Sequence, residues 1–176
     1  MERQKIIELL KENHGLFINY INSLTNEEFL ITYQEKWTAG QQLDHIYLAV
    51  KPVVLALSLP KLIIRFLFGK ANRPSRTYED LVKKYQTKLE NGGKATGRFI
   101  PKAIPLTQKE TLSKELSKTT NVLCQKIKNF TEQELDTLIL PHPLLGKLTI
   151  REMLYFTIYH VGHHHEITKR NLKLSN

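Results

Sequence analysis

Residues 149–167 read TIREMLYFTIYHVGHHHEI, and this stretch decides the expected fold. It opens with Thr149 and Glu152, the Ser/Thr-x-x-Glu pattern in which side chains cap the backbone donors of a new helix. Apolar residues then recur at a spacing that places them on one helix face. The residues of this face are Ile150, Met153, Val161 and Thr168. The pattern predicts an amphipathic helix over about residues 150–172.

Four histidines crowd into the second half of this expected helix. His164 falls near the centre of the apolar face, and His160 lies one turn earlier at its edge. Two imidazoles on adjacent turns are close enough to share one metal ion, which would satisfy two buried polar rings at once. His163 is an alternative to either of them. We expect His163 and His165 to face solvent.

Composition bounds the class of protein. The chain has 176 residues, 41% of them hydrophobic and 24% charged, which favours one globular domain over residues 1–176. The single cysteine, Cys124, excludes an internal disulfide framework and lies in a helical pattern, so we expect a buried inert thiol. The N-terminus lacks signal-peptide features, and the most apolar stretch, residues 53–68, is too short and charged to span a membrane. We therefore expect a cytoplasmic protein.

The formal net charge is +9 and the isoelectric point is near 9.6. The lysines and arginines are scattered, with no run of five and no nucleic-acid-binding motif beside them. This favours a solvated basic surface and no nucleic-acid partner. An anionic small-molecule substrate stays open as an alternative.

Further capping patterns mark helix starts at other points of the chain. They occur at Thr25–Glu28, Thr38–Gln41, Thr107–Glu110 and Thr131–Glu134, with a variant at Thr77–Asp80. The four long helices are expected over residues 2–24, 39–58, 108–130 and 150–172. Shorter helices are expected over 26–29, 61–69 and 78–89, followed by a loop over 92–105 and with no strands. The expected fold is an all-α four-helix bundle with a long crossover between the second and third long helices.

A stable metal site needs a third ligand, and His45 is the best candidate. It lies two turns into the second long helix, in the segment WTAGQQLDHI over residues 37–46. Periodicity alone supports it weakly, because His45 lies off the main apolar arc of that helix. We expect His14 to be exposed on a polar patch, and His142 to be a structural or rim residue in a loop between two prolines.

At this point the sequence resembles the DinB/YfiT-like superfamily. The segment WTAGQQLDHI resembles the family's first motif, and residues 142–167, ending in the histidine-rich stretch, resemble its second. The resemblance implies an up-down-down-up bundle holding one divalent metal ion, typically nickel or zinc. Its ligands would be His45, His160 and His164. Some relatives use low-molecular-weight thiols as co-substrates in transfer reactions. Residues 59–105 match nothing familiar, and we expect them to govern substrate choice.

The expected function is a metal-dependent hydrolase or thiol-dependent S-transferase, since an ion on three neutral imidazoles keeps an open position for water or thiol. The alternative is a non-catalytic metal-binding or stress-related bundle. Candidates beside the metal are Gln41, Tyr159, His163 and Glu152. Asp44 and Glu166 point elsewhere on their helices. We expect the apolar face of residues 62–67 to pack over the bundle. A homodimer contact is the alternative, and an interfacial membrane helix is a third.

Overall fold

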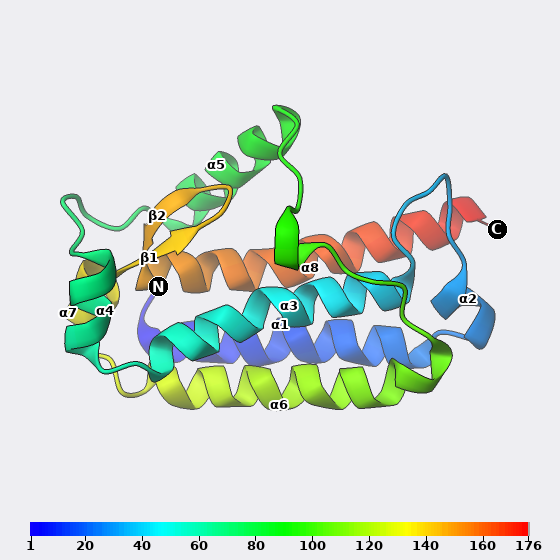
Figure 1. Cartoon of the computed structure of the whole chain (residues 1–176), viewed down its shortest axis with the longest axis horizontal. Coiled ribbons are helices and arrows are strands. Elements are labelled where there is room, and N and C mark those ends of the chain that lie inside the picture. Colours follow the sequence, from blue (N-terminus) through cyan, green and yellow to red (C-terminus); the bar gives the residue numbers. More distant parts are fainter. Residues whose placement is uncertain (176) are drawn as a thin grey trace.

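The computed structural model describes residues 1–175, and the chain is mostly helical. Four long helices lie side by side in Figure 1. Their bounds are α1 (Arg3–Ser23), α3 (Ala39–Ser58), α6 (Lys109–Ile127) and α8 (Ile150–Ser175). Each matches a long helix expected from the sequence, with ends shifted by three residues at most.

Shorter helices fill the connections. They are α2 (Asn26–Leu30), α4 (Lys61–Phe68), α5 (Tyr78–Glu90) and α7 (Glu132–Thr137), with single 3₁₀ turns η1 (Gly97–Phe99) and η2 (Leu106–Gln108). The three short helices expected before residue 90 are confirmed. The long connection from α3 to α6 carries α4 and α5, and α5 packs on α8.

Most of the expected caps are present. Thr25, Thr38 and Thr131 each form the full reciprocal capping box, and Thr149 and Glu152 exchange the same pair of hydrogen bonds. The box expected at Thr107 is wrong. Residue 107 belongs to η2, and α6 begins after that turn without a side-chain cap.

The expectation of no strands is also wrong. Two short strands, β1 (Ile139–His142) and β2 (Gly146–Thr149), pair antiparallel just before α8, with Ile139 opposite Thr149 and His142 opposite Gly146. Residues 143–145 form the turn of the hairpin, and Gly146, which follows them, has a φ of +77°, in the region that glycine adopts most easily. Four-residue strands containing a proline are too short for a clear alternation of apolar and polar residues.

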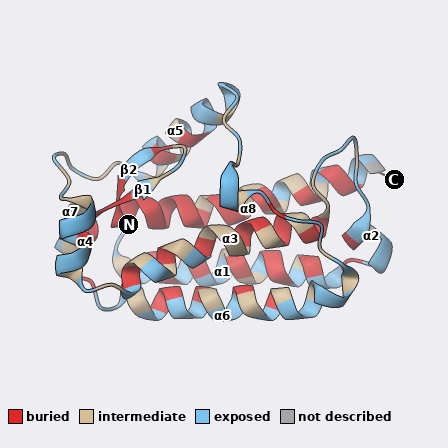
Figure 2. Ribbon diagram, in the orientation of Figure 1, coloured by how far each residue is buried: buried red, intermediate tan, exposed pale blue. Residues whose placement is uncertain are grey.

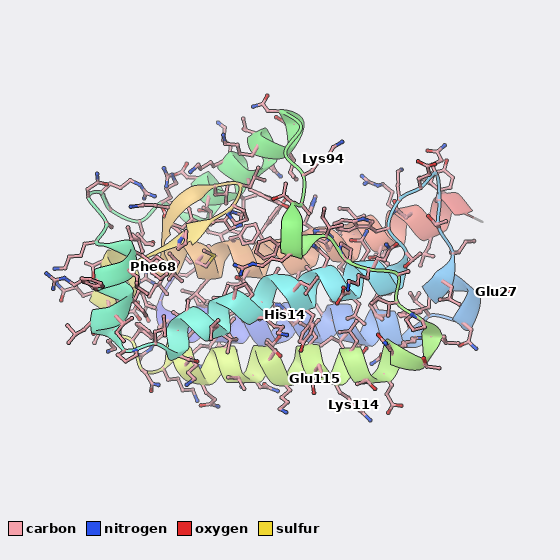
Figure 3. The ribbon with its side chains drawn as sticks, viewed as in Figure 1. His14, Glu27, Phe68, Lys94, Lys114 and Glu115 are labelled. Atoms are coloured by element: carbon pink, nitrogen blue, oxygen red, sulfur yellow. The ribbon has the colours of Figure 1, made fainter. Side chains whose placement is uncertain are left out.

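The core lies where the long helices face one another. The first half of α8 is buried on nearly all sides (Figure 2), because α1, α3, α5, α7 and the hairpin all contact it. This explains why its sequence is apolar beyond a single stripe. Cys124 is fully buried in α6, as expected. In contrast, Lys114 on the same helix points outward (Figure 3).

His14 is buried, so the expectation of an exposed residue is wrong. Its side chain is 1% exposed on α1 (Figure 3), and its Nδ1–H donates to the Leu10 carbonyl over 2.8 Å. Burial lowers the pKa of His14 to about 4, with the hydrogen bond opposing in part. The expectation relied on the neighbours Asn13 and Gly15. These residues flank His14 in sequence but lie on other faces of the helix.

The short helix α4 leaves its apolar face open, so the expectation that this face packs over the bundle is wrong. Leu62 and Phe66 are 79% and 87% exposed. Within residues 1–175 no single helix is long and apolar enough to cross a membrane. Only α3 and α4 taken together reach that length and composition, with a bend of 112° between them.

Candidate metal centre

Three histidines from two helices that are far apart in sequence meet inside the bundle. His45 comes from α3, and His160 and His164 come from successive turns of α8. Their side chains are 5%, 5% and 6% exposed. We refer to this set as the three-histidine cluster. The i, i+4 spacing places the two rings of α8 on one face, and the contact between α3 and α8 brings the third ring against them.

The ring nitrogens of the cluster converge. His45 Nε2 and His160 Nε2 are 3.2 Å apart, and one ring nitrogen from each of the three residues lies within 4.8 Å of the others. The ring centroids of His45 and His164 are 4.5 Å apart, as are those of His160 and His164. The nitrogens therefore face a common point, with the rings fanned around it.

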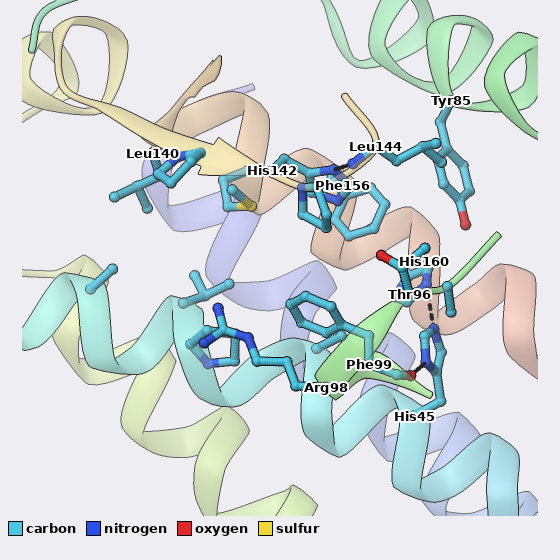
Figure 4. Close-up of a pocket in the computed structure, with 18 of the residues that line it drawn as sticks. His45, Tyr85, Thr96, Arg98, Phe99, Leu140, His142, Leu144, Phe156 and His160 are labelled. Atoms are coloured by element: carbon cyan, nitrogen blue, oxygen red, sulfur yellow. Dashed lines mark hydrogen bonds between the residues drawn. The ribbon is translucent and has the colours of Figure 1, made fainter. Parts of the chain in front are cut away.

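Two acceptors fix which nitrogen of a ring carries the proton. His45 Nδ1–H donates to the Phe99 carbonyl over 2.7 Å, and His164 Nδ1–H donates to Gln42 Oε1. A neutral imidazole with its proton on Nδ1 has a lone pair on Nε2. Phe99 and Gln42 therefore turn two lone pairs toward the centre of the cluster. Figure 4 shows the bond from His45 to Phe99 and the approach of His45 to His160.

Burial keeps the three rings neutral at neutral pH. It lowers the pKa of His45, with the hydrogen bond to Phe99 opposing in part. The pKa of His160 and that of His164 lie well below 6.5, first through burial and then through repulsion by neighbouring histidines. Since only the neutral imidazole binds a metal, the environment favours the ligand form of all three side chains.

The residues present fit a divalent ion. Zinc lies about 2.0–2.1 Å from imidazole nitrogen, so two ligands of a tetrahedral ion are about 3.3 Å apart, close to the separation of His45 and His160. Without an ion, the lone pair of His45 Nε2 meets another ring nitrogen at that distance. The Phe99 carbonyl and Gln42 are the outer hydrogen-bond acceptors that metal-bound histidines usually have. The cluster can hold a metal ion with one position left open.

Aromatic rings pack against the histidines of the cluster. Trp37 lies with its ring centroid 4.9 Å from that of His45, and Phe156 stacks against His160 at 4.6 Å. On the other side, His45 and His160 form part of the wall of a cavity (Figure 4). The cluster is therefore shielded by rings on two sides and open to a cavity on another.

The structure separates the remaining candidates from the cluster. Gln41 is engaged in the capping box with Thr38, and Tyr159 stacks on His163 while its hydroxyl accepts a hydrogen bond from Gln86. His163 is half-buried, and its ring centroid is 5.4 Å from that of His164. It borders the cluster without contributing a converging nitrogen.

Glu152 forms buried ion pairs rather than contacts with the cluster. It is fully buried and bound by Arg73 at 2.7 Å and Arg76 at 3.1 Å, two turns from His160. Burial alone would raise its pKa, but hydrogen bonds from Arg73 and from the backbone of Arg76 and Thr149 bring the pKa of Glu152 down to about 2. Glu166 is exposed and pairs with Lys169, as its position on the helix predicts.

Three further histidine expectations need correction. His163 is half-buried rather than facing solvent, because its ring packs against Tyr159 and His164. His165 is half-buried rather than facing solvent, because its ring packs 4.9 Å from Tyr20 and 5.9 Å from Phe17. His142 lies on strand β1 rather than in an irregular loop, and it lines the cavity beside the cluster. The hairpin, which the sequence did not reveal, carries it there.

Two contributors to the site were missed by the sequence reasoning. Gln42 lies one helical turn before His45, so the spacing in the segment over residues 37–46 could have indicated it. The contribution of Phe99 is a backbone carbonyl from η1, and no side-chain pattern could have signalled it.

Comparison with known proteins places the chain in a family. A family model described as the DinB superfamily matches residues 9–168, which include the three-histidine cluster and all four long helices in whole or in large part. A separate comparison with curated proteins found no match. The match covers well over half of the sequence, so this chain belongs to the DinB superfamily.

Proposed function

We propose that this protein is a metal-dependent enzyme in which the three-histidine cluster holds one divalent ion, zinc or nickel. The observation that carries the proposal is the convergence of three buried, neutral imidazoles beside a cavity. A purely structural ion is usually enclosed by four protein ligands, whereas three ligands leave a position for a reactant. The alternative is a metal-binding bundle without catalytic activity, and it gives the cavity no role.

Of the two reaction types, thiol transfer is the better supported. A bound divalent ion would supply positive charge that stabilises a thiolate or polarises water. No carboxylate lines the cavity within the described part of the chain, so no acidic side chain is placed to act as a general base. A free thiol has a pKa of about 8.5 and water one of about 15.7, so the thiol needs less help to lose its proton. Hydrolysis is the alternative.

The chain's own residues position the reactants. Gln42 and the Phe99 carbonyl hold two imidazoles in the ligand orientation, and Trp37 and Phe156 keep bulk water from the rings. Burial raises the pKa of Tyr85 to about 12, so its hydroxyl stays protonated at the cavity wall. Tyr85 is therefore a hydrogen-bond donor available to a leaving group, with its ring 6.1 Å from that of His160.

The experiment is elemental mass spectrometry on protein purified without a histidine tag. We expect about one equivalent of a transition metal, lost in the triple variant His45→Ala, His160→Ala, His164→Ala. His165→Ala is the matched control, since His165 lies on the same helix but outside the cluster. Absence of metal in the native protein after reconstitution with zinc and with nickel would overturn the proposal.

Activity separates an enzyme from a metal-stabilised bundle. The loaded protein is assayed with a panel of low-molecular-weight thiols paired with chromogenic electrophiles, and with ester and amide substrates. We expect thiol-dependent turnover that the triple variant lacks. If loading changes only the melting temperature and no substrate turns over, the non-catalytic alternative holds.

We also propose that residues 1–176 form one domain whose long helices run up-down-down-up. In Figure 1, α1 and α8 run from left to right while α3 and α6 run from right to left, which supports this order. The connection from α3 to α6 then has to return along the bundle, and it is the part of the chain that brings η1 to the cluster.

A further inference from the structure

A cavity of about 490 Å³ adjoins the three-histidine cluster, with His45 and His160 in its wall. This volume falls within the range of sites that bind small organic molecules. Its walls come from α3, from α5 and the chain after it, from the hairpin and from α8. The cavity is therefore continuous with the site proposed above and reaches well beyond it.

The wall of this cavity is mainly apolar. In Figure 4, side chains of the hairpin and α8, such as His142 and Phe156, lie on one side of the cavity, and Phe99 lies with α3 on the other. Representative members are Val53, Ala56, Phe99, Leu140, Met153 and Phe156. A wall of this composition favours an apolar body, at about 25 cal/mol for each Å² of apolar surface removed from water.

The charged residues of the wall carry one sign only. Lys94 and Arg98 are both cationic, and no aspartate or glutamate lines the cavity within residues 1–175. In Figure 4 the side chain of Arg98 extends away from His45. The cavity thus has a metal-binding end at the cluster and a cationic group directed away from it, with apolar wall between them.

His142 adds a single oriented donor. Its Nδ1 accepts hydrogen bonds from the backbone N–H groups of Leu144 and Leu145, at 3.1 and 3.0 Å. Because Nδ1 accepts, the proton of the ring is on Nε2, and Nε2 forms no hydrogen bond within the described part of the chain. The ring packs 4.3 Å from Phe156, which in turn stacks on His160. His142 is therefore a second donor near the cluster, beside the Tyr85 hydroxyl, in a mainly apolar wall.

We propose that the cavity binds an apolar organic anion, with the apolar body along the wall, the anionic group paired with Lys94 and Arg98, and the reacting group at the cluster. His142 donates a hydrogen bond to a polar atom of the same ligand. As a statement about the substrate this rests on the proposed function, whereas binding of the amphiphile itself does not require a metal.

The test uses three probes of equal chain length and one short probe, titrated calorimetrically below their micellar concentrations. The probes are decanoate, 1-decanol, decyltrimethylammonium and acetate. Each is titrated into the metal-loaded protein and into the triple histidine variant. We expect decanoate to bind best in both proteins, 1-decanol more weakly, and acetate and the cationic amphiphile least. Equal binding of decanoate and decyltrimethylammonium would overturn the anion assignment.

Variants locate the site. Lys94→Gln with Arg98→Gln is expected to weaken decanoate about fivefold and leave 1-decanol unchanged, since exposed ion pairs are worth up to about 1 kcal/mol. Ala56→Phe narrows the cavity away from the cluster and is expected to weaken both probes by about tenfold or more. Phe66→Ser on the exposed face of α4 is the matched control and should change neither. If Phe66→Ser lost binding while Ala56→Phe and the double variant kept it, the cavity assignment would be overturned.

A measurement on the unaltered protein protects against a variant that fails to fold. Nuclear Overhauser contacts between decanoate methylenes and the rings of Phe99 and Phe156 are expected, and contacts confined to Phe66 would overturn the proposal. The two proposals fail separately. Decanoate bound in the cavity of a protein that takes up no metal would end the enzyme proposal alone, and metal without decanoate binding would end this inference alone.

Discussion

At the scale of single residues, the site depends on hydrogen bonds behind the ligands. His45 and His164 each give their Nδ1 proton to a fixed oxygen, and this leaves Nε2 free to face the centre of the cluster. Such outer partners fix ring orientation and raise ligand basicity. Of these two acceptors, mutation can remove the Gln42 side chain, whereas the acceptor at Phe99 is a backbone carbonyl.

We predict that Gln42→Leu weakens zinc affinity about 10- to 100-fold, the range found when an outer partner of a ligating histidine is removed. Gln42→Glu keeps an acceptor and is expected to retain affinity. The matched control is Gln41→Leu, which breaks the capping box with Thr38 at a cost of about 1 kcal/mol in stability without touching the cluster. Competition with a chromophoric chelator measures the affinities, and equal values for the Gln42 and Gln41 leucine variants would contradict the prediction.

His14 leads to a prediction about acid stability. Its pKa is about 4 in the folded protein and about 6.5 when unfolded, so the unfolded state takes up the proton first as pH falls. The stability that neutral His14 contributes is therefore present above pH 6.5 and is lost between pH 6.5 and 4. In metal-free protein, the free energy of unfolding should decrease as the pH is lowered from 6.5 to 4. The decrease should be less steep in His14→Leu than in the native protein, by about 1.4 kcal/mol per pH unit. Parallel slopes in urea titrations would count against it.

At the scale of elements, close packing fixes how α3 meets its neighbours. Gly40, in the first turn of α3, has Phe29 of α2 directly against it, and a Cβ built there would lie 2.8 Å from the ring. Glycine is normally unfavourable inside a helix. Here the absence of a side chain lets the start of α3, which carries Gln42 and His45, approach α2.

We predict that Gly40→Ala destabilises the protein by about 1–3 kcal/mol, the usual cost of overpacking. Gly15→Ala on α1 is the matched control, since nothing lies within 4 Å of a Cβ there. It should stabilise by about 0.5–1 kcal/mol through helix propensity. Urea unfolding of both variants gives the comparison, and a stabilised Gly40→Ala would show that α2 yields to the added methyl group.

At the scale of the whole molecule, an ion at the cluster would join elements that meet only on folding. His45 and the pair on α8 are separated by more than one hundred residues, so the unfolded chain does not hold them together. Anything that binds the folded state alone stabilises it by mass action. Metal binding and global stability are therefore coupled.

We predict that free zinc at 100 times its dissociation constant raises the free energy of unfolding by about 2.7 kcal/mol. The melting temperature of the native protein should rise accordingly and return after chelation, whereas the triple histidine variant should not respond. Differential scanning calorimetry makes the comparison. A rise of the same size in the variant would place the ion elsewhere.

How much of this could be predicted from the sequence differs between parts of the molecule. The long helices were predictable because capping and periodicity are local signals that tertiary packing did not overrule. The pair on α8 followed from helix geometry, whereas His45 was favoured mainly by family resemblance. His45 lies off the apolar arc of α3, yet α8 and η1 cover that side of the helix.

The remaining parts needed the tertiary structure. Gln41 and Gln42 are adjacent in sequence, and only the position of α8 decides that Gln42 reaches His164 while Gln41 stays in the cap. The hairpin was missed because it is short and contains a proline, and with it the position of His142 in the cavity wall. Contacts made by backbone carbonyls, such as that of Phe99, leave no trace in side-chain patterns.

The short turn η1 performs two tasks with three residues. The Phe99 carbonyl anchors an imidazole of the cluster, and Arg98, the residue before it, lines the cavity. Both residues belong to one 3₁₀ turn, so a movement of its backbone shifts both. A ligand that moves the backbone of this turn would therefore also move the hydrogen-bond acceptor of His45. The order of binding would then matter. An ion bound first would hold His45 in place, and through the Phe99 carbonyl it would restrain this part of the cavity wall before an organic ligand binds.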